Sequence, residues 1–177
     1  MPNMNALLMR LLPRGMRGRA RLALLVLALL AALAGNAALE GRVVSVPDGD
    51  TLVVYTGAGR TRRVRLYGVD CPELAQPFGP EAARAAEALA LFKTVALTVM
   101  DEDRYGRLVA VVALENGETL NEALLRQGLA WHYGRFCKAP VCRGWKALEQ
   151  GARKERVGLW RQKAPEAPWR WRAAHPR

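Results

Sequence analysis

The sequence predicts an α+β domain, mainly β, in which five short strands form a closed barrel of the OB type and three helices pack on it. Three observations lead to this prediction. Short runs rich in β-branched residues begin at Gly41 and are separated by turn residues. An Ala-rich helical segment follows the third run, and two more helical segments follow the fifth. Other α+β arrangements share this order of elements, so the pattern alone leaves them open.

The strands are predicted from composition and alternation. "GRVVSV" and "TLVVYT" flank the turn "PDGD", and "GAGR" leads into the alternating run "TRRVRLYGVD". "TVALTVM" and "LVAVVAL" flank the charged loop "DEDRYGR". No repeat and no second domain is apparent. The predicted strands are residues 41–46, 51–56, 61–70, 94–100 and 108–114.

The helices are predicted from their start signals. Residues 79–92 are Ala-rich, with Pro80 at an early helical position and Glu81 in the first turn. Thr119, with Glu122 three residues later, has the spacing of a capping box and begins the second helix. The third helix is predicted within residues 145–160.

The N-terminal residues 1–37 are typical of a signal peptide. Five arginines and no acidic residue accompany a 13-residue apolar run, Leu22–Ala34, which is shorter than the roughly 20 residues that span a bilayer. Cleavage is expected after Ala34, Ala37 or Ala38. We therefore expect a periplasmic or secreted protein. An uncleaved membrane anchor through residues 22–34, or a buried helix, remains the alternative.

The rest of the chain divides into a domain at residues 38–162 and a tail at 163–177. The tail, rich in Trp, Arg and Pro, shows no periodicity and is expected to be flexible. The full chain has 27 Lys and Arg against 16 Asp and Glu, a net charge of +11. Without residues 1–37 the balance is 22 against 16, or +6. An anionic partner is favoured, although positive charge alone does not identify it.

The three cysteines have different surroundings in the sequence. Cys137 and Cys142 lie in "CKAPVC", where an oxidising compartment favours a local disulfide over two free thiols. Neither His nor further Cys lies at zinc-finger spacing. Cys71 is left over; no His is near it in sequence, so a small half-buried side chain is a better interpretation than a nucleophile.

Acidic residues gather at two predicted strand ends. Asp48 and Asp50 flank Gly49 in one turn, and Asp70 and Glu73 follow the third strand. Hard divalent cations take several oxygen ligands, which two neighbouring turns can supply. Asp and Gly are also ordinary turn formers, so "DGDT" alone is weak support for a site.

Three arginines, Arg65, Arg104 and Arg107, are candidates for binding phosphate, because a guanidinium offers a fork of donors matched to phosphate oxygens. Arg65 and Asp70 are five residues apart, so on a regular strand their side chains would face opposite sides. A bulge or sharp twist at Gly68 would be needed to bring them together.

From about Leu39 to Trp160 the chain resembles the staphylococcal nuclease (thermonuclease) family. The resemblance is carried, in family order, by "VPDGDTLVV", "RVRLYGVDCPE", "FGPEA", "DRYGRLVAVV", "NEALLRQGLA" and "GLW". It implies an OB-type barrel with three helices and Ca²⁺-dependent cleavage of DNA and RNA to products with 3′-phosphate ends.

The resemblance also implies roles for residues. Asp50 and Asp70 match the calcium-binding carboxylates of the family, and the backbone carbonyl of Cys71 matches a further ligand. The best-known member of the family has Thr at the position of Cys71. Glu73 matches the presumed general base. Arg65 and Arg107 match the phosphate-binding arginines of the family. Tyr105, and Tyr133 if a gap is allowed in the alignment, match nucleotide-contacting positions, and Arg104 lies next to Tyr105 in the sequence.

Two other functions remain open. An OB barrel can bind nucleic acid without cutting it, and a basic envelope protein could use its surface and tail for interactions. A complete catalytic set favours the nuclease. We expect a monomer with no obligate protein partner that prefers single-stranded DNA or RNA, with membrane association only if the N-terminal segment is retained.

Overall fold

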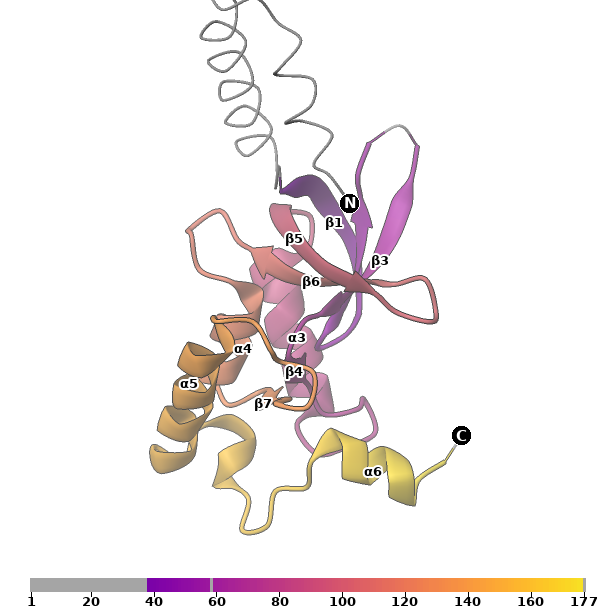
Figure 1. Ribbon diagram of the computed structural model, residues 1–177. Helices are drawn as coiled ribbons and strands as arrows, with labels where there is room; N and C mark the ends of the chain where they lie inside the picture. Colours follow the sequence, from indigo (N-terminus) through magenta and orange to yellow (C-terminus); the bar gives the residue numbers. More distant parts are fainter. Residues whose placement is uncertain (1–37, 58, 177) are drawn as a thin grey trace, which may run out of the picture. The chain divides into compact units, whose positions relative to one another are not determined.

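The computed structural model describes residues 38–57 and 59–176 (Figure 1). The predicted signal peptide lies outside the described residues. Within these ranges no helix combines the length and the apolar character needed to cross a membrane.

Five strands close into a mixed barrel in the order β1-β2-β3-β6-β5, which confirms the predicted fold class. Neighbouring strands are antiparallel except β3 and β6, whose parallel pairing sets Val64 beside Leu108. The barrel strands are β1 (Leu39–Asp48), β2 (Thr51–Tyr55), β3 (Thr61–Leu66), β5 (Thr94–Glu102) and β6 (Leu108–Ala113).

Alternation along the strands builds the core. In β6 every second residue is buried, and the β-branched and Leu side chains of the other strands meet these residues inside the barrel. Removing this apolar area from water supplies the main driving force for the fold. The most deeply buried apolar residues of the barrel strands are Val43, Leu52, Val54, Val64, Leu66, Leu97, Ala110 and Val112.

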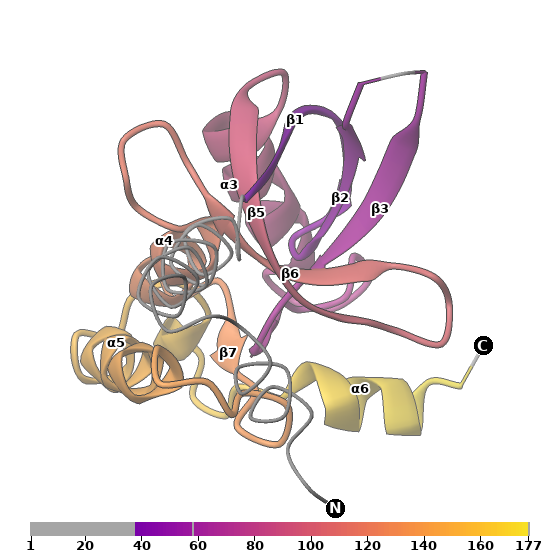
Figure 2. The ribbon, with the colours of Figure 1, turned by 45° about the horizontal axis from the view of Figure 1, so that its top comes forward.

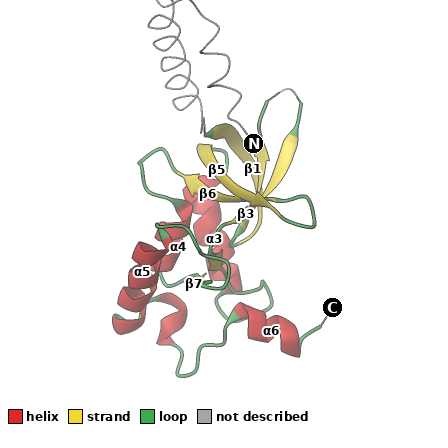
Figure 3. Ribbon diagram, in the orientation of Figure 1, coloured by secondary structure: helices red, strands yellow, loops and turns green. Residues whose placement is uncertain are grey.

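The helices lie to one side of the barrel strands, and the first two of them pack against the barrel (Figure 3). The first, α3 (Gly79–Ala90), packs on β1, while α4 (Leu120–Arg126) packs on β6, α3 and α5 (Cys142–Lys154). The predicted capping box is present: the Glu122 N–H donates to Thr119 Oγ1 at 3.1 Å, and the Thr119 N–H donates to Glu122 Oε2 at 3.2 Å.

The third predicted helix differs in its bounds. α5 begins three residues earlier than expected and ends at Lys154, and a short 3₁₀ turn, η1 (Gly158–Arg161), follows it. Arg156 and Gly158 both have positive φ angles, which cannot continue a right-handed helix.

The third predicted strand is not continuous. It breaks at Gly68, whose φ is 66°, and resumes as β4 (Val69–Asp70), which leaves the barrel to pair with β7 (Trp131–His132). This small second sheet was not predicted, because two-residue strands carry no periodic signal. The break at Gly68 provides the change of direction that a site containing both Arg65 and Asp70 requires.

The C-terminal tail also differs from the expectation of flexibility. Residues Pro168–Ala174 form a further helix, α6, with Pro168 at its start (Figure 2). Seven residues are too few to show a helical period in the sequence, and a helix this short needs tertiary contacts to be stable. Those contacts reach the site described below.

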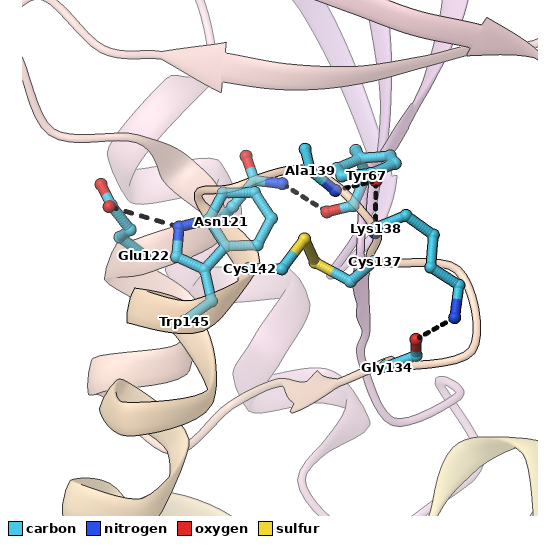
Figure 4. Close-up of a disulfide and its surroundings, with 9 residues drawn as sticks. All are labelled: Tyr67, Asn121, Glu122, Gly134, Cys137, Lys138, Ala139, Cys142 and Trp145. Atoms are coloured by element: carbon cyan, nitrogen blue, oxygen red, sulfur yellow. Dashed lines mark hydrogen bonds between the residues drawn. A yellow bond between two sulfur atoms is a disulfide. The ribbon is translucent and has the colours of Figure 1, made fainter.

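Cys137 and Cys142 form a disulfide that closes the loop before α5 (Figure 4). The loop is held by Tyr67, whose hydroxyl accepts hydrogen bonds from the backbone N–H groups of Lys138 at 2.7 Å and Ala139 at 3.1 Å. The disulfide therefore pins α5 to the chain segment that contains Gly68.

Candidate active site

Two turns from distant parts of the sequence meet at one end of the barrel. Asp50 follows β1, where its N–H donates a hydrogen bond to Asp48 Oδ1 at 3.0 Å. Asp50 Oδ2 then accepts the N–H of Cys71 at 2.6 Å, so the first turn is tied directly to the end of β4. Asp50 is 2% exposed. A carboxylate this deeply buried must be compensated by charge and hydrogen bonds.

Arg65 provides part of that compensation. One of its guanidinium nitrogens contacts Asp50 Oδ1, and the other donates to Asp70 Oδ1 at 2.6 Å. Asp70 has no exposed surface. The guanidinium thus bridges the two carboxylates, as the geometry of a planar fork permits. The structure brings these three predicted site residues together.

Glu73 lies in the turn between β4 and α3. Its N–H donates to Gln76 Oε1 at 3.2 Å, and its carbonyl accepts the N–H of Gln76 at 2.8 Å. Gln76 itself is buried, which holds this turn against the body of the protein. Glu73 is thereby placed near Asp70, with its carboxylate partly accessible.

A further arginine, which the sequence analysis did not single out, completes the cluster. Arg172 of α6 donates from Nη2 to Asp70 Oδ2 at 2.7 Å and from Nη1 to Asp70 Oδ1 at 3.1 Å. The same Nη1 donates to Glu73 Oε1 at 2.8 Å. The hydrogen bond to Asp70 raises the pKa of Arg172 above its usual value, against a smaller opposing effect of burial, so this side chain is a permanent cation.

Cys71 is buried and is the one free cysteine of the described residues. Burial raises the pKa of its thiol well above the usual value, which outweighs the opposite effect of Arg65. A thiol that stays protonated is a poor nucleophile. The structure therefore agrees with the interpretation of Cys71 as a small packed side chain.

The predicted residues of the β5–β6 loop form a separate cluster. Arg107 pairs with Asp103, Nε to Oδ2 at 2.7 Å, and Arg104 donates to the hydroxyl of Tyr105 at 2.6 Å. The Tyr105 ring lies under both arginines, 4.8 Å from the guanidinium of Arg104 and 5.5 Å from that of Arg107, yet 68% of the residue is exposed. Arg107 is thus bound to Asp103 rather than to the acidic cluster.

Opposing effects act on Asp103. Burial works to raise its pKa, but hydrogen bonds from the backbone and side chain of Arg107 lower the pKa below its ordinary value. Asp103 therefore remains ionised and fixes the direction of the Arg107 side chain.

Tyr133 lies next to the Gly68 turn, since its N–H donates to the Gly68 carbonyl at 2.8 Å. Its ring stacks on Trp169 of α6, with centroids 4.9 Å apart and planes at 3°. Trp169 also meets Trp131 edge to face at 5.5 Å, and Trp131 pairs with Asp70 across β4 and β7. The tail thus covers the aromatic side of the same site.

The acidic residues have the oxygen ligands that a hard metal ion takes. Asp50, Asp70 and Glu73 offer carboxylate oxygens, which Ca²⁺ prefers, and the structure already gathers cationic guanidinium groups on them. Among the described residues, the one group of three ligand-type side chains whose ligand atoms lie within 4.8 Å of one another is His132 with Cys137 and Cys142, and both of its sulfurs are used in the disulfide.

Together, the barrel and the acid–arginine cluster define a class of protein: hydrolases of the nuclease type built on a small β-barrel. The family model described as "Staphylococcal nuclease homologue" matches residues 63–162. The chain therefore belongs to the staphylococcal nuclease family.

Individual relatives agree with this assignment. An uncharacterized endonuclease of Escherichia coli O157:H7 is 37% identical over 134 residues, 76% of this chain and 85% of that protein. The micrococcal nuclease of Shigella flexneri is 36% identical over 143 residues, 76% of this chain and 81% of that protein. The staphylococcal-like nuclease CAN1 of Arabidopsis thaliana is 42% identical over 110 residues, 62% of this chain but 33% of that protein. The chain spans only about a third of the length of the plant relatives that it matches.

Sequence reasoning missed Arg172, Trp169 and Gln76. Their importance depends on contacts between residues far apart in the chain: Arg172 and Asp70 are 102 positions apart. One local signal was available, because Trp169 and Arg172 are three residues apart after Pro168, a spacing that places both on one face of a short helix.

Proposed function

We propose that this protein is an exported Ca²⁺-dependent nuclease that hydrolyses phosphodiester bonds of DNA and RNA and leaves 3′-phosphate ends. The observation that carries the proposal is the meeting, at one end of the barrel, of acidic residues from two separate turns, Asp50 from one and Asp70 and Glu73 from the other, with Arg65 of β3. The named nuclease relatives support the same reaction class.

Asp50 and Asp70 would hold the calcium ion, together with the backbone carbonyl of Cys71. When bound, the ion would neutralise charge on the phosphate and help place a water. Glu73 is the base in this proposal: its carboxylate takes a proton from the water whose oxygen bonds to phosphorus. The bond from phosphorus to the 5′-oxygen breaks, and that oxygen takes a proton from a solvent water, while Glu73 returns its proton to the solvent.

Arg65 and Arg107 would stabilise the negative charge that builds on the phosphoryl oxygens and on the leaving 5′-oxygen. For Arg65 the position beside both aspartates supports this role. Arg107 is held by Asp103 in a separate cluster, so its part in this role would require its side chain to turn from Asp103 to the scissile phosphate, while the Tyr105 ring that it shares with Arg104 would bind the strand nearby. Tyr133 would contact a neighbouring nucleotide.

A labelled single strand digested with Ca²⁺ or with EGTA tests the reaction. With Ca²⁺, the fragments should carry 3′-phosphate and new 5′-hydroxyl ends, which a polynucleotide kinase labels without prior phosphatase treatment. EGTA should abolish cleavage. Fragments with 5′-phosphate ends would contradict the proposed bond, and full activity in EGTA would contradict the calcium requirement.

Two variants separate the roles of metal and base. Asp50→Asn should abolish Ca²⁺ binding measured by calorimetry, whereas Asp101→Asn, at an exposed position of β5, should not. Glu73→Gln should lower turnover by about a hundredfold or more, with Glu81→Gln on the surface of α3 as the control. If the unchanged protein binds nucleic acid but cleaves it neither with Ca²⁺ nor with EGTA, it is instead a non-catalytic binding module.

A further inference from the structure

We propose that α6 is an autoinhibitory clasp: Arg172 holds the carboxylates that the metal would use, Trp169 covers Tyr133, and the helix must leave before calcium and a strand can bind. The inference rests on the calcium site and the strand-binding role of Tyr133 proposed above. Its new element is competition between a segment of this chain and both ligands.

The first support is the set of contacts made by Arg172. It reaches both oxygens of Asp70 and one oxygen of Glu73, at 2.7–3.1 Å. With Arg65 on the other side, both oxygens of Asp70 are engaged by guanidinium nitrogens. A metal ligand cannot offer the same lone pairs to a guanidinium and to a cation, so the two occupants compete.

Charge supports the same conclusion. Asp50, Asp70, Glu73 and Arg65 together carry a formal charge of −2, which a divalent cation would neutralise. Arg172 supplies only one positive charge. It therefore compensates the buried carboxylates in part and leaves a net attraction for a cation of higher charge.

Trp169 supplies the second half of the clasp. Its ring is almost parallel to that of Tyr133, with centroids 4.9 Å apart, which is the arrangement in which an aromatic side chain stacks on an unpaired base. Trp169 and Arg172 are three residues apart and lie on one face of α6. A single helix face thus presents a ring to the tyrosine and a cation to the carboxylates.

The clasp is also anchored at its beginning. The buried side chain of Gln76, which supports the Glu73 turn through Oε1, donates from Nε2 to the Glu166 carbonyl at 2.7 Å. Beyond this anchor the helix has only seven residues, and Arg172 remains 41% exposed. Such a helix opens at low cost, because short helices are marginal and partly exposed ion pairs are weak.

Calcium binding by the isolated protein, measured by calorimetry, tests the clasp without relying on activity. Arg172→Ala should bind Ca²⁺ about threefold to tenfold more tightly than the unchanged protein. In the unchanged protein only the molecules with α6 open can bind the ion, so its apparent affinity is the intrinsic affinity multiplied by the open fraction. Trp169→Ala should shift the affinity in the same direction although its side chain does not contact the acids. Arg170→Ala, which removes a charge from the exposed part of α6, is the control and should change little.

Hydrogen exchange adds a structural measurement. Ca²⁺ should accelerate exchange of the amides of Arg170, Trp171 and His175, whose hydrogen bonds form the first and last turns of α6 and its caps. In Arg172→Ala these amides should exchange fast before Ca²⁺ is added. If both proteins bind Ca²⁺ equally and α6 stays protected, the clasp is wrong while the calcium site stands.

Two further results would overturn the clasp. An absence of Ca²⁺ binding in both proteins would remove the calcium site and the clasp together. In EGTA, a short oligothymidylate should bind Arg172→Ala more tightly, although losing a positive charge ordinarily weakens binding to nucleic acid. Weaker binding with unchanged Ca²⁺ affinity would make Arg172 a phosphate-binding residue instead.

Discussion

The guanidinium of Arg65 donates to Asp70 Oδ1 at 2.6 Å, although the two residues are only five positions apart and a straight strand would direct them to opposite faces. The left-handed turn at Gly68 makes the contact possible. The same guanidinium reaches Asp50, so Arg65 is the centre of the site.

Arg65→Lys should lower turnover by about a hundredfold or more, the usual cost of losing one donor aimed at transition-state charge. A lysine keeps the charge but lacks the planar fork that spans Asp50 and Asp70. Arg63→Lys, at an exposed position of the same strand, should retain activity. Thermal unfolding checks that both variants fold, and near-normal turnover in Arg65→Lys would remove this residue from the mechanism.

Gly68→Ala should destabilise the protein by at least about 1 kcal/mol more than Gly106→Ala, measured by urea unfolding. Both glycines have similar positive φ angles, 66° and 73°, so the backbone penalty is shared. An added Cβ at Gly68 would come within 2.9 Å of Cys137 Cβ, whereas at Gly106 it would meet nothing within 4 Å. Equal losses would show that packing against the disulfide is unimportant.

Reducing the disulfide should lower the free energy of unfolding by no more than about 2 kcal/mol, because Cys137 and Cys142 close a very short loop. Since Cys71 is buried, thiols should be counted in denaturant without reductant. One reactive thiol per chain is expected. Three would show that the bridge does not form in the isolated protein.

Tyr105→Ala should selectively slow cleavage of heat-denatured DNA, by roughly fivefold or more, if the exposed ring stacks on unpaired bases. The competing interpretation is that Tyr105 only packs against Arg104 and that binding is electrostatic. Rates on native and denatured DNA at equal salt separate the two, with Tyr55→Ala, another exposed tyrosine, as the control. Equal rates on both substrates, unchanged by the mutation, would rule out stacking.

Much of the fold could be predicted from the sequence because its signals are local. The alternating residues of β6, the turn after β1 and the Thr119–Glu122 capping box each act within a few residues of the chain. The acidic and basic residues of the site were also found this way, since they lie at strand ends within recognisable motifs. The need for a break at Gly68 followed from strand geometry alone.

The tertiary structure decided the rest. Asp50 and Cys71, 21 positions apart, are joined only when two turns meet, and the pairing of β4 with β7 brings Trp131 beside Asp70. The placement of Arg172 on Asp70 and Glu73 depends on contacts across about a hundred residues. Local propensity cannot specify such contacts, because their free energy arises from packing and charge between segments that are independent in the sequence. The sequence by itself therefore predicted the barrel and the acidic and basic residues of the candidate site, and the packed chain determined that its own C-terminal helix lies on Asp70 and Glu73.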